Sequence, residues 1–112
     1  MSSEIDNIQR IYRVDKFKVP TEARGEFLER VQMTHAILRT LPGFVEDLVL
    51  EQTSGPGVFN FVTVAIWAST ADVEHAKGVM TAKHAESGVN AKELVSRLRI
   101  EADQANYMEV AG

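Results

Sequence analysis

The sequence contains no cysteine, one tryptophan and only three histidines among its 112 residues. Without cysteine, the fold has no disulfides, and neither a catalytic thiolate nor a cysteine-based zinc site is available. His35, His75 and His84 are widely spaced and form no HExxH pair, so no metal site is expected. Phosphate-binding glycine motifs and the GxSxG nucleophile motif are also absent, which removes the usual sequence support for nucleotide chemistry and for serine hydrolysis.

Long apolar runs and an excess of positive charge are lacking as well. The 12 Lys and Arg residues are scattered along the chain and are outnumbered by 16 Asp and Glu, giving a formal charge of −4. This balance argues against nucleic acid or an anionic membrane as a partner. The longest mainly apolar run, residues 61–68, is far shorter than the roughly 20 residues of a bilayer span, and the polar start MSSEIDNIQR does not resemble a signal peptide. We therefore predict a cytoplasmic protein.

With 45% hydrophobic residues, the chain is long enough for one domain, residues 1–112, with a core of its own. Residues 1–9 show no periodicity and are predicted to be frayed. The apolar spacing and turn residues predict strands at 11–19, 44–53, 58–68 and 104–110, and helices at 21–41, 69–88 and 91–99. This β-α-β-β-α-(α)-β order predicts an α+β, ferredoxin-like protomer with a four-stranded antiparallel sheet.

Local signals support these segments. Pro42-Gly43 is a typical stop for the first helix, and the turn Ser54–Gly57 separates two strands of a hairpin. Ser69 and Asp72 resemble a capping box before the second helix, with the shorter acid in place of glutamate. In the strand 44–53, alternation places Phe44 with Leu48 and Leu50 on one side, and the acidic pair Glu46-Asp47 is interpreted as a solvated rim.

The strand 58–68 is apolar on both faces. One face carries Phe59, Phe61, Thr63, Ala65 and Trp67, and the other Val58, Val62, Val64 and Ile66. Because two helices cover only one face of a sheet, we expect the other face to pack against a second copy of the chain. The prediction is a homodimer in which two sheets face each other as a dimeric α+β barrel.

Trp67 stands where this strand turns into the second helix, on the same side as Phe61 and Thr63. A core aromatic residue and the wall of a pocket for a flat ligand are both compatible with this position. His84 follows Met80 by one helical turn, on the stripe expected to face the sheet.

Two histidines are candidates for proton transfer. His35 on the first helix and His84 on the second can be brought to one cleft, whereas His75 lies on the opposite side of its helix. With an ordinary pKa of about 6.5, an imidazole there serves as a base or as an axial ligand of haem. A structural histidine that only hydrogen-bonds to a neighbour is the alternative.

The order of the elements, together with two motifs, resembles a known family. The motifs are Leu41-Pro42-Gly43-Phe44 and Ile66-Trp67-Ala68-Ser69, and the similarity extends from about Ile11 to Val110. The chain resembles the antibiotic biosynthesis monooxygenase domain family of dimeric α+β barrels. The resemblance implies ferredoxin-like protomers paired through their sheets, with a ligand cleft between sheet and helices beside Trp67.

The resemblance also implies two kinds of chemistry. Members that oxygenate polycyclic phenols use neither metal nor flavin; the protein helps to remove a proton, and the substrate carbanion reduces dioxygen. Several of them carry asparagine at the position of Thr63, whose hydroxyl does not offer an amide's donor and acceptor together. Haem-degrading members use an asparagine on the first strand and a histidine where this chain has Ala76 and Lys77, and this chain has neither.

The resulting hypothesis is a cofactor-independent monooxygenase that oxidises a small aromatic, phenolic or quinol substrate with dioxygen. The expected catalytic residues are Trp67, His84 and His35, and the expected substrate contacts are Phe61, Thr63 and Met80. The alternatives are a non-catalytic dimeric module that binds a small hydrophobic ligand in a stress response, and a haem-binding or haem-degrading monooxygenase.

Overall fold

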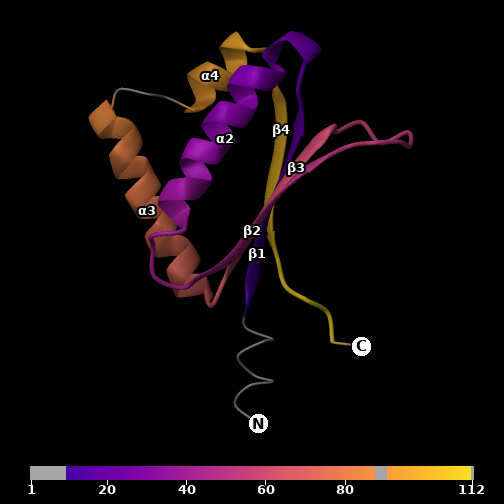
Figure 1. The fold of residues 1–112 in the computed structure, drawn as a ribbon. Coiled ribbons are helices and arrows are strands. Elements are labelled where there is room, and N and C mark those ends of the chain that lie inside the picture. Colours follow the sequence, from indigo (N-terminus) through magenta and orange to yellow (C-terminus); the bar gives the residue numbers. More distant parts are fainter. Residues whose placement is uncertain (1–9, 88–90, 112) are drawn as a thin grey trace.

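The chain folds into an antiparallel sheet with its helices on one face, and the computed structural model describes residues 10–87 and 91–111. The sheet has four strands in the order β2 (Phe44–Glu51), β3 (Phe61–Trp67), β1 (Ile11–Lys18) and β4 (Glu101–Tyr107). The helical elements are η1 (Thr21–Ala23), α2 (Arg24–Leu38), α3 (Thr70–Ser87) and α4 (Ala91–Arg97). Helices α2, α3 and α4 lie on the same side of the sheet (Figure 1).

The predicted α+β, ferredoxin-like fold is confirmed. The predicted fraying of residues 1–9 and the end of the second helix at about Gly88 lie outside the described residues.

The predicted hairpin is present, but its strands are shorter than the predicted 44–53 and 58–68. Side-chain hydrogen bonds hold the residues that connect the two strands. Gln52 Nε2 donates to the carbonyl oxygens of Gly55 and Gly57, at 3.2 and 2.9 Å. Asn60 accepts from the backbone N–H of Val19 at 2.8 Å and donates to its carbonyl oxygen at 2.9 Å, which ties the end of the hairpin to the end of β1.

The last strand occupies residues Glu101–Tyr107 rather than the predicted 104–110. Met108 and Val110 suggested the later strand because they are apolar and alternate in the sequence. The pairing is set instead by the backbone of β1, from Lys18 opposite Glu101 to Tyr12 opposite Tyr107. Because most residues in the first half of β4 are polar, apolar alternation could not locate it.

Strand β2 contains a bulge, which is a shift between Phe44 and Glu46 in its pairing with β3. One extra residue turns every following side chain to the other face. Phe44 therefore does not share a face with Leu48 and Leu50, and that prediction is wrong. Asp47 turns to the helix side and its side chain is only 12% exposed, so its interpretation as part of a solvated rim is also wrong.

The apolar side chains between sheet and helices form two separate clusters. One contains Phe17, Val19, Ala23, Phe27, Phe61 and Ile100. The other contains Ile11, Ala65, Trp67, Val73 and Ala76. Both β1 and β3 contribute to each cluster, so the middle of these strands lies between the two.

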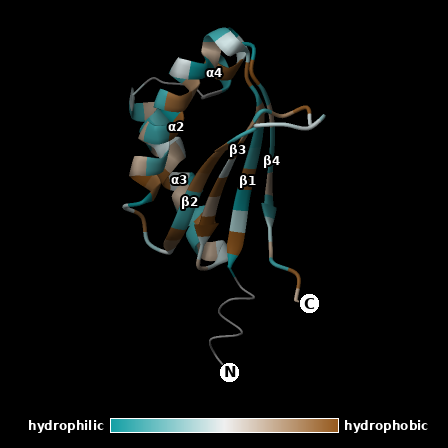
Figure 2. Cartoon of the chain, turned by 45° about the vertical axis from the view of Figure 1, so that its right-hand side comes forward, coloured by the Kyte–Doolittle hydropathy of each residue, from teal (hydrophilic) through white to brown (hydrophobic). Residues whose placement is uncertain are grey.

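The other face of the sheet is covered by no helix of the described residues (Figure 2). Leu48, Leu50 and Tyr107 are 43%, 48% and 47% exposed, and their positions in the strand pairing place them on this face. Val62 and Val64 on the same face are half-buried. A sheet face of this composition favours a partner surface over water. Within the described ranges, no helix combines the length and apolar character needed to cross a membrane.

Gly43 connects α2 to β2 where a side chain does not fit. Its φ is +79°, and a Cβ atom would lie 2.0 Å from Cγ of Asp72. Its carbonyl oxygen accepts a hydrogen bond from the backbone N–H of Ala68 at 2.8 Å. Asp72 in turn bonds to Ser69, whose hydroxyl donates to Oδ2 at 2.9 Å and accepts from the Asp72 backbone N–H at 3.2 Å, which confirms the predicted cap. The turn thus fixes the start of α3 beside Trp67.

We predict that Gly43→Ala lowers the free energy of unfolding by about 1–3 kcal/mol, because the substitution combines a positive φ with a steric clash. Urea denaturation followed by circular dichroism measures this change. Gly78→Ala is the matched control: its Cβ would meet no atom within 4 Å, and alanine in a helix should raise stability by roughly 0.5–1 kcal/mol. Equal effects of the two substitutions would contradict the constraint at Gly43.

Candidate active site

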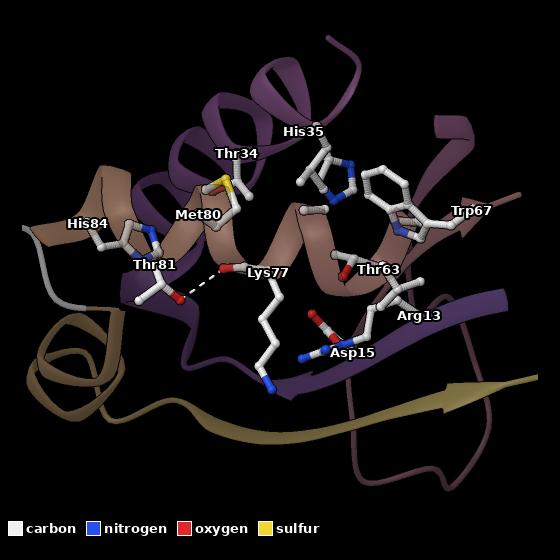
Figure 3. Close-up of a pocket in the computed structure, with 14 residues that line it drawn as sticks. Arg13, Asp15, Thr34, His35, Thr63, Trp67, Lys77, Met80, Thr81 and His84 are labelled. Carbon is white, nitrogen blue, oxygen red and sulfur yellow. Dashed lines mark hydrogen bonds and ion pairs between the residues drawn. The ribbon is translucent and has the colours of Figure 1, made fainter. Parts of the chain in front are cut away.

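A cleft of about 250 Å³ opens between the sheet and helices α2 and α3 (Figure 3). Strands β1 and β3 line it from one side and α2 from another, with Thr34, His35 and Leu38. Helix α3 contributes a stripe at intervals of three or four residues, formed by Val73, Ala76, Lys77, Met80 and His84. The cleft is therefore enclosed by elements far apart in the sequence.

The structure brings most of the predicted site residues together. Trp67, Thr63, His35, His84 and Met80 all line the cleft. His75 does not line it and is exposed on α3, as its helical position predicts.

Phe61, the remaining predicted substrate contact, does not line the cleft. It is 2% exposed and its ring centroid lies 5.0 Å from that of Phe27, which also lies 5.0 Å from Phe17. The phenyl ring points to the same face as Thr63 but belongs to the apolar cluster at the far end of β3. Sharing a face of a strand was not sufficient to place it in the site.

Trp67 is both a core residue and part of the cleft wall. It is 2% exposed and packs edge-on against Phe44, with ring centroids 5.6 Å apart and an interplanar angle of 85°. Its cluster also includes Val73 and Ala76, which line the cleft themselves. The indole is consequently a fixed wall, and its position does not depend on a ligand.

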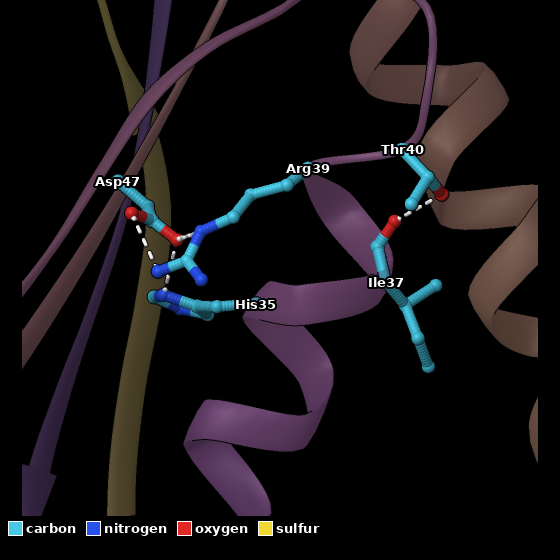
Figure 4. Close-up of polar contacts among 5 residues, drawn as sticks. All are labelled: His35, Ile37, Arg39, Thr40 and Asp47. Atoms are coloured by element: carbon cyan, nitrogen blue, oxygen red, sulfur yellow. Dashed lines mark hydrogen bonds and ion pairs between the residues drawn. The ribbon is translucent and has the colours of Figure 1, made fainter.

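His35 is buried at the end of α2 and lies beside the acid that the bulge turns inward. The residue is 6% exposed, and its Nδ1 lies 3.0 Å from Oδ2 of Asp47 (Figure 4). The carboxylate lies off the N–H direction, so among the described residues Nδ1 has no aligned hydrogen-bond partner. Arg39 holds the same carboxylate with two hydrogen bonds, Nε to Oδ2 at 3.0 Å and Nη2 to Oδ1 at 3.2 Å.

Burial lowers the pKa of His35 from its ordinary value of 6.5, since an imidazolium loses hydration there. The negative charge of Asp47 opposes this effect and raises the pKa, while the guanidinium of Arg39 lowers it further. The net lowering favours the neutral imidazole at pH 7. This is the form that accepts a proton.

Arg13 and Asp15 also line the cleft and were not among the predicted site residues. Their side chains form an ion pair, Arg13 Nε to Asp15 Oδ1 at 2.7 Å, and Asp15 Oδ2 accepts a longer contact of 3.5 Å from Gln104. A signal for them was present, because they occupy the positions between Ile11 and Phe17 on the inward face of β1. Charged residues between two buried positions of one strand face indicate a polar site inside the fold.

No group of three histidine, aspartate or glutamate side chains able to hold a metal ion occurs within residues 10–87 and 91–111. The cleft residues are suited to general base catalysis by a neutral imidazole, electrostatic stabilisation by Arg13, and contact of a flat ligand with Trp67.

This is an α+β protein with a cleft between one sheet face and two helices. The sequence model of the antibiotic biosynthesis monooxygenase family matches residues 10–86. The chain belongs to this family, which supports a monooxygenase-type activity. No curated protein sequence matches the chain.

Solved structures share the fold at low sequence identity. A conserved protein from Methanosarcina mazei Go1 is 16% identical, with a TM-score of 0.73 over 96% of this chain and 99% of that one. SnoaB, a cofactor-independent oxygenase from Streptomyces nogalater, is 20% identical, with a TM-score of 0.65 over 93% and 96% of the two chains. MhuD, a haem degrader from Mycobacterium tuberculosis, is 21% identical, with a TM-score of 0.67 over 91% and 97%.

We predict that His35 makes stability fall as the pH decreases through about 6.5. The lowered pKa means that the unfolded chain binds a proton that the folded protein does not, so each pH unit below this value lowers the free energy of unfolding by at most about 1.4 kcal/mol, until the folded pKa is reached. His35→Gln should reduce this slope, while His75→Gln, on the exposed side of α3, should leave it unchanged. Urea denaturation at a series of pH values tests this, and identical slopes for the wild type and His35→Gln would contradict it.

Proposed function

We propose that the protein is a cofactor-independent monooxygenase that oxidises a small phenolic, quinol or other electron-rich aromatic substrate in the cleft beside Trp67. The observation that carries this proposal is that His35 is buried and lines the cleft, where burial lowers its pKa and favours the neutral form. Family membership and the fold shared with SnoaB support it. The substrate donates its own electrons to dioxygen.

His35 acts as the general base in this proposal. The approach of Asp47 to Nδ1 at 3.0 Å favours the tautomer with the proton on Nδ1, which leaves Nε2 to accept a proton from the substrate. Resting-state hydrogen bonds of catalytic groups are often poorly aligned and tighten when the substrate binds. Asp47 is thus a positioning residue, and Arg39 fixes its carboxylate.

The reaction balances without a further reductant. In an anthrone, the keto tautomer of a polycyclic phenol, loss of a proton from the activated methylene carbon gives a carbanion, which forms a C–O bond with dioxygen. Cleavage of the O–O bond then leaves one oxygen in a carbonyl group, and the other leaves as water with the two methylene hydrogens. Arg13 lines the cleft and stabilises the substrate oxygen that carries negative charge in the anion.

Haem is the less favoured ligand in this proposal. The volume of the cleft alone, about 250 Å³, is below the roughly 300–1,000 Å³ of pockets for drug-sized ligands, and the ion pair of Arg13 and Asp15 lines it. His75 lies outside the lining, which leaves no histidine at the point of α3 nearest to Trp67. The proposed reaction therefore involves no haem, although MhuD shares the fold.

We predict that His35→Gln lowers kcat/KM for oxygen consumption by about 10²–10⁴-fold on an anthrone or hydroquinone that the wild type oxidises. The matched control His75→Gln should retain activity, since this residue is exposed and outside the cleft. An oxygen electrode makes the measurement. Unchanged turnover in His35→Gln would exclude it as the base, and binding of the compounds without any oxygen uptake would favour the non-catalytic binding module.

Asp47→Asn should shift the acid limb of the pH profile of kcat/KM to lower pH, because the charge of Asp47 raises the pKa of His35. A purely structural role of Asp47 would lower activity without moving the profile. Asp103→Asn is the matched control, since Asp103 is exposed on β4 and its pairing with Lys16 places it on the opposite sheet face.

The protein is further proposed to be a homodimer that pairs through the uncovered sheet face. Leu48 and Leu50 on this face are exposed in the single chain, and burial of apolar area of this kind drives stable association. A negative charge at such a position opposes pairing without disturbing the protomer, because the side chain is not part of its core.

We predict that Leu48→Glu converts a dimer into a monomer of 12.4 kDa, while Ala82→Glu on the exposed side of α3 leaves the dimer intact. Size-exclusion chromatography with light scattering measures the mass at micromolar concentration. A wild-type mass equal to that of one chain would overturn the proposal.

A further inference from the structure

A second cavity of about 400 Å³ lies between α2 and α3, next to the cleft. We call it the interhelical cavity. Thr34, Met80 and His84 line both spaces, so the two share a boundary of side chains rather than a layer of backbone. A ligand longer than the cleft can therefore extend past these residues into the interhelical cavity.

The spacing of the residues explains why this cavity exists. Helix α2 presents Arg30, Met33, Thr34 and Ile37 to it, and α3 presents Met80, Lys83, His84 and Ser87. In each set the residues are three or four positions apart for the most part, which is the spacing of one face of a helix. The face of α2 that lines this cavity is adjacent to the face that carries His35. Helices α2 and α3 lie side by side in Figure 1, and their facing stripes bring two cations, Arg30 and Lys83, to one cavity that Met33, Ile37 and Met80 also line.

The two cations of the interhelical cavity, Arg30 and Lys83, have no ion-pair partner among residues 10–87 and 91–111. Arg13, Arg24, Arg39 and Arg97, by contrast, each form an ion pair with a carboxylate. Glu86 also lines the cavity, yet no ion pair joins it to Arg30 or Lys83. The cavity thus offers two unpaired cations and one anion, with His84 at the boundary to the cleft.

We propose that the interhelical cavity binds a carboxylate at the far end of the substrate, and that the substrate is an extended, flat aromatic acid. Its reacting ring lies in the cleft between His35 and Trp67, its middle passes Met80 and Thr34, and its carboxylate meets Arg30 and Lys83. Met33 and Ile37 supply apolar contacts to the linking part. This assignment rests on the proposed function for the identity of the reacting ring, but the carboxylate site itself does not require catalysis.

Trp67 provides the readout, because it is the only tryptophan of the chain and it lines the cleft. An anthraquinone carboxylate and the matching carboxamide are non-reacting probes of the same shape that differ in one charge. Quenching of the Trp67 fluorescence gives their dissociation constants. We expect the carboxylate to bind about tenfold more tightly than the carboxamide, the size of one charge-assisted hydrogen bond at a partly exposed site.

The double variant Arg30→Gln/Lys83→Gln should reduce this preference to about one, whereas Glu86→Gln, which removes the only anion of the cavity, should increase it. Lys18→Gln is the control for net charge, since Lys18 pairs with Glu101 on the far end of β1 and is not part of the lining. It should leave the preference unchanged. Circular dichroism spectra that match the wild type establish that each variant is folded.

Equal affinity of the wild type for both probes, or a preference that persists in the double variant, would overturn the proposal. Absence of binding by either probe would overturn it as well. Oxygen uptake with a neutral anthrone is measured separately on the same proteins and decides the monooxygenase proposal. Oxygen uptake without a preference for the carboxylate probe would support the monooxygenase proposal and reject the carboxylate site. A preference for the carboxylate probe without oxygen uptake would support the carboxylate site and reject the monooxygenase proposal.

Discussion

The bulge in β2 determines which acid reaches the cleft. A regular strand from Phe44 would turn Asp47 to the uncovered face, and His35 would then be buried without an anion near Nδ1. The single extra residue brings Asp47 beneath the end of α2, where Arg39 binds its carboxylate. Burial favours the neutral imidazole because an unpaired buried charge is costly, while the nearby carboxylate of Asp47 opposes this effect. The orientation of the base depends on the bulge.

The second constraint is the division of the core. Phe61 and Trp67 anchor different apolar clusters at the two ends of β3, and the polar residues of the cleft occupy the strand segments between them. Each end of the sheet is thus held against a helix by packed aromatic rings, so the middle can remain open without loss of the fold. This explains how Trp67 is a core residue and a cleft wall at once. The wall is rigid because its other contacts are formed before any ligand binds.

The fold could be predicted from the sequence because apolar periodicity, the Pro42-Gly43 stop and the Ser69 cap all specify local structure. The histidine positions on α2 and α3 could be predicted for the same reason, since a helix face follows directly from spacing. Three features could not be obtained in this way. The bulge in β2 has no apolar pattern that would reveal it, and it turns Asp47 to the opposite face of the sheet. Strand β4 has few apolar residues from which to locate it. The exclusion of Phe61 from the cleft depends on where α2 crosses the sheet. Such features follow from pairing and packing between distant segments.

The two cavities differ in how they are built, and this difference bears on how a substrate is selected. His35 and Trp67 are buried, and His35 lies beside Asp47, so the position of the reacting ring is set in advance and little freedom is lost on binding. At the interhelical cavity, Lys83 is exposed and neither it nor Arg30 is paired within the described residues, so both are available to a charged group of a ligand. In this arrangement the rigid cleft positions the reacting ring, and the adaptable cationic site recognises a remote carboxylate. Catalysis and the selection of the substrate would then occur at different places. Binding energy gained at the remote end would then hold the reacting carbon against the base, which is the way in which a part of a substrate that does not react contributes to rate.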